Sequence, residues 1–149
     1  MRKVNQITNI ISFLMMAAYL ILLASVWEKL PDTIPTHYNV TGQADAYGQK
    51  VWLLLIPGVM LLMFLLLVVV EHFPQVWNMP VRITEENRER QYLIGAVLLG
   101  ITKISCIAIF SIIDLPLLIP GFPFWTLWVV LGVMFAAIIG CIIWSIKAR

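Results

Sequence analysis

The side chains of this chain that could do chemistry lie in one polar stretch, residues 30–50, which reads LPDTIPTHYNVTGQADAYGQK. His37, Asp32 and Asp45 could together bind a divalent cation and hold a water molecule on it. Their spacing matches no established metal signature, because a second histidine one helical turn away is missing. The alternative is structural: both aspartates accept hydrogen bonds in turns, and His37 packs and hydrogen-bonds within the stretch. We favour the structural alternative and expect no catalytic residue.

Proline and glycine predict the local structure of this stretch. Pro31 and Pro35 cannot lie in the interior of a continuing helix, so a preceding helix must end here. Residues 34–40 alternate imperfectly between apolar and polar side chains, which indicates a short extended segment. Gly42 and Gly48 are each free to adopt positive φ and mark two turns. The stretch therefore predicts a compact lid of one or two short strands.

The elements that must position this lid are membrane helices. Of 149 residues, 61% are hydrophobic and 12% are charged, whereas soluble domains contain about 25% charged residues. A helix of ~20 apolar residues crosses the hydrocarbon layer of a bilayer. Four stretches reach that length and predict an all-α membrane protein, a single domain over residues 1–149, with spans at residues 7–27, 51–70, 93–113 and 124–146.

Lysine and arginine predict the orientation of these spans. Seven of the ten lie near the chain ends and in the connection 71–92, whereas residues 28–50 contain two. Because short cytoplasmic segments are enriched in these residues, we expect both termini in the cytoplasm and the lid outside the cell. The basic residues are dispersed and form no basic face, so nucleic-acid binding is excluded.

Three ionisable residues lie in or beside the predicted spans. Lys103 lies within the third span, ~15 Å deep if the membrane begins near residue 93. No carboxylate on another predicted helix clearly shares its depth. Lys103 therefore snorkels to the surface, lines a hydrated cavity or pairs with a carboxylate of another chain, and we favour snorkelling. Glu71 and His72 end the second span, where we expect them to be hydrated and not to form a proton relay.

The predicted spans also carry two packing features. Tyr19, near the middle of the first span, is expected to hydrogen-bond a neighbouring helix. Gly132, Ala136 and Gly140 lie four residues apart, so their small side chains form one stripe on the last span. Such stripes let helices approach closely in lipid. The stripe is a packing surface either within the chain or against another chain, in a homodimer or with a membrane partner.

The connection before the third span contains a helix start signal. Thr84 is expected to be the N-cap, because Glu85, Glu86 and Asn87 follow it and acidic side chains favour the first turn. Glu86 and Arg90 are four residues apart, in the favourable order for an ion pair. A helix is therefore predicted from about Glu85.

Two stretches resemble a known family. The lid is similar to the outer-loop motif LPD-x-IP-x-H-x4-G-x2-D-x2-G of a bacterial membrane domain of unknown function, which also forms the N-terminal part of the SdpI-type immunity proteins. The matching positions are Leu30, Pro31, Asp32, Ile34, Pro35, His37, Gly42, Asp45 and Gly48. The second stretch, NMPVRITEENRERQY, resembles the cytoplasmic pattern of that family at Asn78, Pro80, Val81, Ile83, Thr84, Glu86, Asn87, Arg90, Gln91 and Tyr92.

This resemblance implies a multi-pass protein of the bacterial cytoplasmic membrane. For SdpI it also implies protection against a secreted peptide toxin and signalling to a membrane-tethered regulator. This chain lacks the further membrane region and second motif of SdpI. Our leading hypothesis is a non-enzymatic receptor or immunity-type protein whose lid engages an extracellular peptide, without a cofactor unless a divalent cation binds the lid. The alternatives are a small subunit of a membrane transport complex and a membrane metalloenzyme.

Overall fold

The computed structural model describes residues 1–149 and contains four long helices and one β-hairpin. The helices are α1 (Arg2–Val26), α2 (Leu55–Glu71), α3 (Arg88–Leu118) and α4 (Trp125–Lys147), and the strands are β1 (Thr33–Tyr38) and β2 (Ala44–Gln49). Short 3-10 helices follow α1, precede α2 and follow α2: η1 (Trp27–Lys29), η2 (Lys50–Leu54) and η3 (Pro74–Val76). All four long helices are long and apolar enough to cross a membrane. The predicted all-α membrane fold is confirmed.

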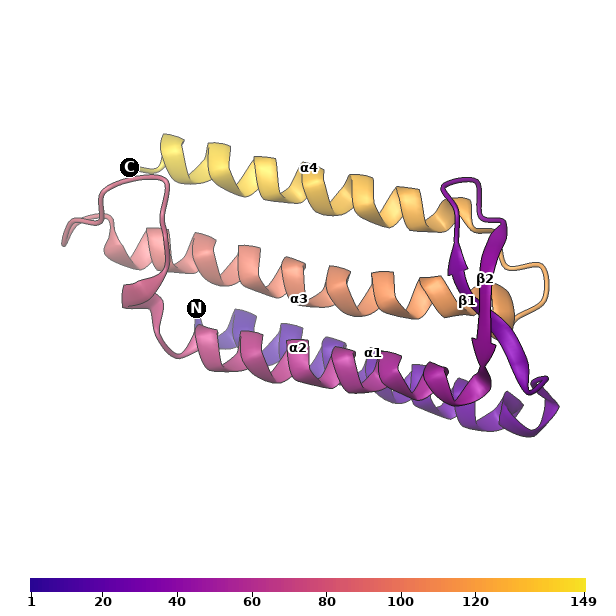
Figure 1. The fold of residues 1–149 in the computed structure, drawn as a ribbon. Coiled ribbons are helices and arrows are strands. Elements are labelled where there is room, and N and C mark those ends of the chain that lie inside the picture. The colour runs from indigo at the N-terminus through magenta and orange to yellow at the C-terminus, as the bar shows by residue number, and fades with distance from the viewer.

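The helices run side by side, and the two ends of the bundle differ (Figure 1). At one end β1 and β2 lie across the bundle near the connection between α3 and α4; we call this the hairpin end. Both chain termini and the connection between α2 and α3 lie at the other end, which we call the termini end. Helix α3 packs against α1, α2 and α4, and is therefore the central helix.

The outward faces of the helices expose large apolar side chains. Ile21 on α1, Leu62 on α2 and Val133 on α4 are 70%, 64% and 62% exposed. Water would make such a surface costly, whereas hydrocarbon would not. The exposed faces therefore fit a multi-pass membrane protein.

The main core lies between α1, α2 and α3. Met16, Met60 and Ile107 contribute one buried side chain from each of these helices. Ile34 of β1 belongs to the same core and is 1% exposed. Burying an isoleucine side chain contributes roughly 1.5–3 kcal/mol, so Ile34 anchors the hairpin to the bundle.

Helices α1 and α3 approach closely at Gly100. A Cβ atom on Gly100 would lie 2.5 Å from Cγ2 of Thr8. Small residues permit such contacts between membrane helices, where van der Waals packing drives association. The α1–α3 interface is consequently tight on the termini side of the core.

The start of α3 differs from the prediction. Regular helix begins at Arg88 and not near Glu85. Thr84 nevertheless caps the preceding turn: the Asn87 N–H donates to Thr84 Oγ1 at 3.3 Å, and the Thr84 N–H donates to Asn87 Oδ1 at 2.9 Å. This reciprocal pair resembles a capping box with asparagine in the second position. The predicted ion pair between Glu86 and Arg90 is wrong, because Glu86 Oε2 instead accepts a hydrogen bond from Thr84 Oγ1 at 3.1 Å.

Two glycine predictions have opposite outcomes. Gly42 adopts φ of +83° in the turn between the strands, as predicted. Gly48 lies inside β2 and pairs with Ile34, so the predicted second turn is wrong. A Cβ atom on Gly48 would lie 2.9 Å from Cγ2 of Thr36, so close cross-strand packing explains a glycine there.

The small-residue stripe on α4 faces away from the bundle. Gly132, Ala136 and Gly140 are exposed, and Cβ atoms added to the two glycines would contact nothing within 4 Å. Of the two alternatives that the sequence leaves open, packing within the chain is therefore wrong. The α4 surface opposite α3 has no partner in the described chain.

Candidate functional site

Asn39 organises the turn of the hairpin. Its Oδ1 accepts hydrogen bonds from the Thr41 N–H at 3.0 Å, the Thr41 hydroxyl at 2.7 Å and the Gln43 N–H at 3.0 Å. An asparagine that bonds the backbone two residues ahead makes an Asx turn. The prediction that Asp32 and Asp45 accept the turn hydrogen bonds is wrong, because Asn39 does so.

The three candidate metal ligands do not converge. Nδ1 of His37 lies 2.5 Å from Oδ1 of Asp45, which links β1 to β2, and their side chains are 67% and 46% exposed. Asp32 points elsewhere: its Oδ1 lies 3.3 Å from Nζ of Lys50. No group of three or more His, Cys, Asp or Glu side chains in residues 1–149 is placed to hold a metal ion. The exposed pairs each contribute about 0–1 kcal/mol to hairpin stability.

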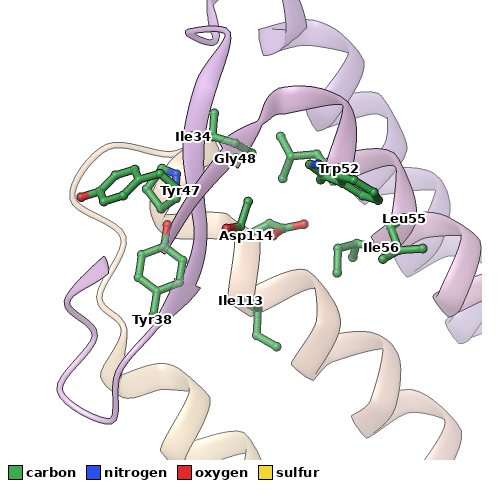
Figure 2. Close-up of a pocket in the computed structure, with 12 residues that line it drawn as sticks. Ile34, Tyr38, Tyr47, Gly48, Trp52, Leu55, Ile56, Ile113 and Asp114 are labelled. Carbon is green, nitrogen blue, oxygen red and sulfur yellow. The ribbon is translucent and has the colours of Figure 1, made fainter. Parts of the chain in front are cut away.

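A pocket of about 410 Å³ lies beneath the hairpin (Figure 2). We call it the hairpin pocket. The two strands, η2, the start of α2 and the end of α3 form its wall. The residues that line it are Ile34, Pro35, Thr36, Tyr38, Tyr47, Gly48, Trp52, Leu53, Leu55, Ile56, Ile113 and Asp114. The wall is thus mostly apolar, and it contains no lysine, arginine or histidine.

Asp114 is the charged side chain of this pocket. It lies near the end of α3 and is 7% exposed. The hydroxyl of Tyr19, itself 4% exposed, donates to Asp114 Oδ2 at 2.5 Å. The predicted hydrogen bond from Tyr19 to a neighbouring helix is confirmed. Asp114 Oδ1 accepts no hydrogen bond from the protein, and Asp114 has no ion-pair partner.

Three aromatic residues line the pocket together with Asp114. Tyr38 and Tyr47 lie on one side of Asp114, and Trp52 lies on the other (Figure 2). Burial, and after it the negative charge of Asp114, raises the pKa of Tyr38 above its ordinary value. Tyr38 therefore remains a neutral hydrogen-bonding phenol across the physiological range.

The hairpin is held over the pocket by the connection between α3 and α4. The rings of Tyr38 and Phe124 lie 5.9 Å apart. At Gly42 an added Cβ atom would lie 2.8 Å from the Phe124 ring, so the turn is in direct contact with this ring. The connection between α3 and α4 thus supports the hairpin.

A buried polar cluster occupies the other half of the bundle. Lys103 Nζ donates hydrogen bonds to Glu71 Oε1 and Asn9 Oδ1, and Asn9 Nδ2 donates to Glu71 Oε2 at 3.2 Å. The side chains of Lys103 and Glu71 are 0% and 1% exposed. We call these three residues the ion-pair cluster. The predictions that Lys103 snorkels and that Glu71 is hydrated are wrong, because the last turn of α2 directs Glu71 into the bundle at the level of Lys103.

A second cavity, of about 620 Å³, opens beside this cluster at the termini end. Its wall is mostly polar and consists of Met1, Arg2, Asn5, Gln6, Asn9, Glu71, His72, Pro74 and Gln75. Glu71 and Asn9 therefore belong both to this wall and to the ion-pair cluster. His72 is the C-cap residue that follows α2, and its Nδ1 lies 2.7 Å from the Val68 carbonyl oxygen.

The second motif closes the termini end. Asn87 is buried and donates to the carbonyl oxygen of Arg82 at 3.0 Å. Gln91 donates to the carbonyl oxygens of Ser145 and Ala148 at 3.0 and 3.1 Å, and so fixes the end of α4 to the start of α3. The remaining polar or turn-forming motif positions are exposed: Asn78, Pro80, Thr84, Glu86 and Arg90. The buried part of the motif therefore has a structural role.

One family model and one relative match part of the chain. The family model described as "Domain of unknown function (DUF1648)" matches residues 14–61. The chain is also 28% identical over 94 residues to an uncharacterized protein of Archaeoglobus fulgidus, which covers 54% of this chain and 50% of that protein. This chain spans about half the length of that relative. No solved structure matches the chain.

The family match covers the hairpin but not the whole pocket. Residues 14–61 include Tyr19, both strands and Trp52, whereas Asp114 and Lys103 lie outside the matched segment. The sequence does not predict that Asp114, Tyr47 and Trp52 line a pocket together. An acidic residue in the apolar run SIIDLPLL was the available signal for Asp114. No pattern in the sequence points to the two aromatic residues.

Proposed function

We propose that this chain is a non-enzymatic receptor of the immunity type in the cytoplasmic membrane of a bacterium. In this proposal the hairpin end faces outside the cell, and part of an extracellular peptide binds in the hairpin pocket. The pocket itself is the observation that carries the proposal. Its volume of about 410 Å³ falls within the roughly 300–1,000 Å³ of small-ligand sites, which are mostly apolar with a few placed polar groups.

Charge distribution supports the orientation. Arg2 and Lys3, the connection 71–92 and Lys147 lie at the termini end, whereas the hairpin end has two lysines. The enrichment of lysine and arginine in short cytoplasmic segments then places the termini inside. A pocket beneath the hairpin is in that case open to extracellular molecules.

A metalloenzyme receives less support than a receptor. His37 and Asp45 form an exposed pair, and Asp32 contacts Lys50 instead of completing a ligand set. A catalytic metal requires about three converging protein ligands and an open position. The hairpin does not supply this arrangement, and its residues act as a cover for the pocket.

A complementation experiment tests the proposed function. The gene is deleted in its host, and susceptibility to a panel of membrane-active peptides is measured with wild type, Ile113→Trp or Val129→Trp restored. Ile113 lines the pocket, so a tryptophan there fills it. Val129 is 50% exposed on α4 and is the matched control for the added bulk.

We expect deletion to increase susceptibility to at least one peptide, and wild type and Val129→Trp to restore protection while Ile113→Trp does not. Unchanged susceptibility across the whole panel after deletion would contradict the immunity role. Full protection by Ile113→Trp, at wild-type abundance in the membrane, would show that the pocket is not the binding site.

A further inference from the structure

We propose that the hairpin pocket selects a ligand with a cationic group, an alkylammonium or a guanidinium, on an apolar body, and that Asp114 is the anionic partner of that group. The inference rests on the proposed function, because it names the class of ligand for the same pocket. A lysine or arginine side chain between apolar residues of a peptide meets this description.

The two buried carboxylates of the bundle differ in how their charge is compensated. Glu71 accepts hydrogen bonds from Lys103 and Asn9 within the protein. Asp114 has Tyr19 as its single donor and no cationic partner. A buried carboxylate is costly unless a positive charge compensates it. Glu71 has such a charge in Lys103, whereas Asp114 has none. A cation delivered by a ligand would supply the missing charge.

The free oxygen of Asp114 is accessible to such a ligand. Asp114 lines the pocket, and its side chain is drawn at the centre of the lining residues in Figure 2. Oδ2 is occupied by the Tyr19 hydroxyl, whereas Oδ1 has no protein donor. The fully buried side-chain atoms that lack a hydrogen-bond partner are Asn5 Oδ1 and Ser12 Oγ. Asp114 Oδ1 is not one of them, so it retains some exposed surface. An ammonium or guanidinium group in the pocket could therefore donate to Oδ1.

The pocket wall also favours a cation beside the carboxylate. Aromatic faces attract ammonium and guanidinium groups, and carboxylates form charge-assisted hydrogen bonds with them. Tyr38, Tyr47 and Trp52 add three aromatic side chains to the wall of the pocket that Asp114 also lines. Ile56 and Ile113 continue the wall with apolar surface for the body of the ligand.

The protein has no cation of its own for this position. Lys50 is the basic residue that enters η2 beside the pocket, but its Nζ contacts Asp32 Oδ1 at 3.3 Å and the Leu30 carbonyl oxygen at 3.5 Å. The same atom lies 5.6 Å from the centre of the Trp27 ring. Lys50 is thus engaged outside the pocket, and Asp114 remains free for a ligand.

Fluorescence anisotropy with three peptides tests this selectivity. The peptides are labelled amphipathic peptides that differ at one central position, which is lysine, acetyl-lysine or glutamate. They are titrated with the purified full chain in neutral detergent micelles. Wild type is expected to bind the lysine peptide on the order of 10-fold more tightly than the acetyl-lysine peptide, because a hydrogen bond to a charged group is lost.

Two variants separate Asp114 from the net charge of the protein. Asp114→Asn keeps the size of the side chain and is expected to bind the lysine and acetyl-lysine peptides equally. Glu85→Gln makes the same change of net charge at an exposed side chain of the connection between α2 and α3, away from the pocket, and should keep the wild-type preference. Size-exclusion chromatography and thermal unfolding check that both variants are folded.

The outcomes distinguish this inference from the proposed function. A lysine preference that persists in folded Asp114→Asn would overturn the role of Asp114. Equal binding of all three peptides to wild type, weakened by Ile113→Trp, would overturn cation selection and leave the receptor proposal standing. Absence of binding to wild type for every peptide would overturn both. If Asp114→Asn does not fold, the comparison of lysine and acetyl-lysine on wild type still decides the selectivity.

Discussion

Replacing Lys103 by methionine should strongly destabilise the bundle. The side chain of Glu71 is 1% exposed, and Lys103 is its cationic partner. Methionine has a similar length but no charge, so Lys103→Met leaves a buried carboxylate with Asn9 as its remaining donor. Removal of one partner from a buried ion pair costs about 3–5 kcal/mol, because the other charge stays uncompensated.

The double variant should recover most of that loss. Lys103→Met combined with Glu71→Leu removes both charges and keeps much of the volume, a change that is often neutral or stabilising by about 1–4 kcal/mol. Asn9 then loses both partners, which costs roughly 1–3 kcal/mol if no water replaces them. These two effects are of similar size and opposite sign. The double variant is therefore expected near wild-type stability, well above Lys103→Met.

Equilibrium unfolding in micelles measures these differences. For a chain of this length, a loss of about 3–5 kcal/mol lowers Tm by on the order of 10 °C. Lys147→Met, which removes an exposed lysine from the last turn of α4, is the matched control and should change stability little. Wild-type stability of Lys103→Met would refute the reasoning. The reasoning would also be refuted if the double variant lost as much stability as the two single variants together, because the two charges would then not compensate each other.

Two further predictions concern the hairpin. Gly42→Ala should destabilise hairpin docking more than Gly121→Ala. Both positions have positive φ, at +83° and +81°, but only at Gly42 would the new Cβ atom approach Phe124, at 2.8 Å. Limited proteolysis of the hairpin compares the two variants, and equal protection would contradict the contact. Burial, and to a smaller extent the charge of Asp114, raises the pKa of Tyr38, so the unfolded chain ionises first and the contribution of neutral Tyr38 to hairpin stability is lost as pH rises from the ordinary tyrosine pKa of about 10 through the raised pKa of the folded chain. Tyr38→Phe should reduce this alkaline loss, Asp114→Asn should reduce it partly, and tyrosinate absorbance measures the titration; an unchanged profile in Tyr38→Phe would contradict the sign.

The fold was predictable because its signals are local. Span length and hydropathy depend on about twenty successive residues, and the four predicted spans coincide with four helices. Pro31 and Pro35 stop the first helix whatever surrounds them, and Gly42 turns the chain within the hairpin itself. Predictions of this kind need no knowledge of which helix faces which.

The site was largely not predictable, because its contacts join distant segments. Lys103 and Glu71 are 32 residues apart, and Tyr19 and Asp114 are 95 apart. Whether such residues meet depends on the depth and rotation of each helix, which hydropathy does not determine. The sequence analysis pointed to His37 as a site residue because histidine can bind a metal ion. The pocket beneath it is instead built from aromatic and apolar side chains, whose types are also those of ordinary core residues.

The arrangement of the two buried carboxylates limits how the ends of the bundle can communicate. Asp114, with its donor Tyr19, lies near the end of α3 at the hairpin, whereas Glu71, the partner of Lys103, is the last residue of α2. Between them lies a layer of apolar side chains from all three helices: Met16, Met60 and Ile107, each at most 8% exposed. The buried Ser12, whose Oγ has no hydrogen-bond partner, precedes Met16 on α1. A proton or ion has no continuous chain of polar side chains across this layer. A ligand at Asp114 would therefore pass no proton or ion along side chains to the termini end, whereas a displacement of α1, α2 or α3 could be transmitted through the packed layer.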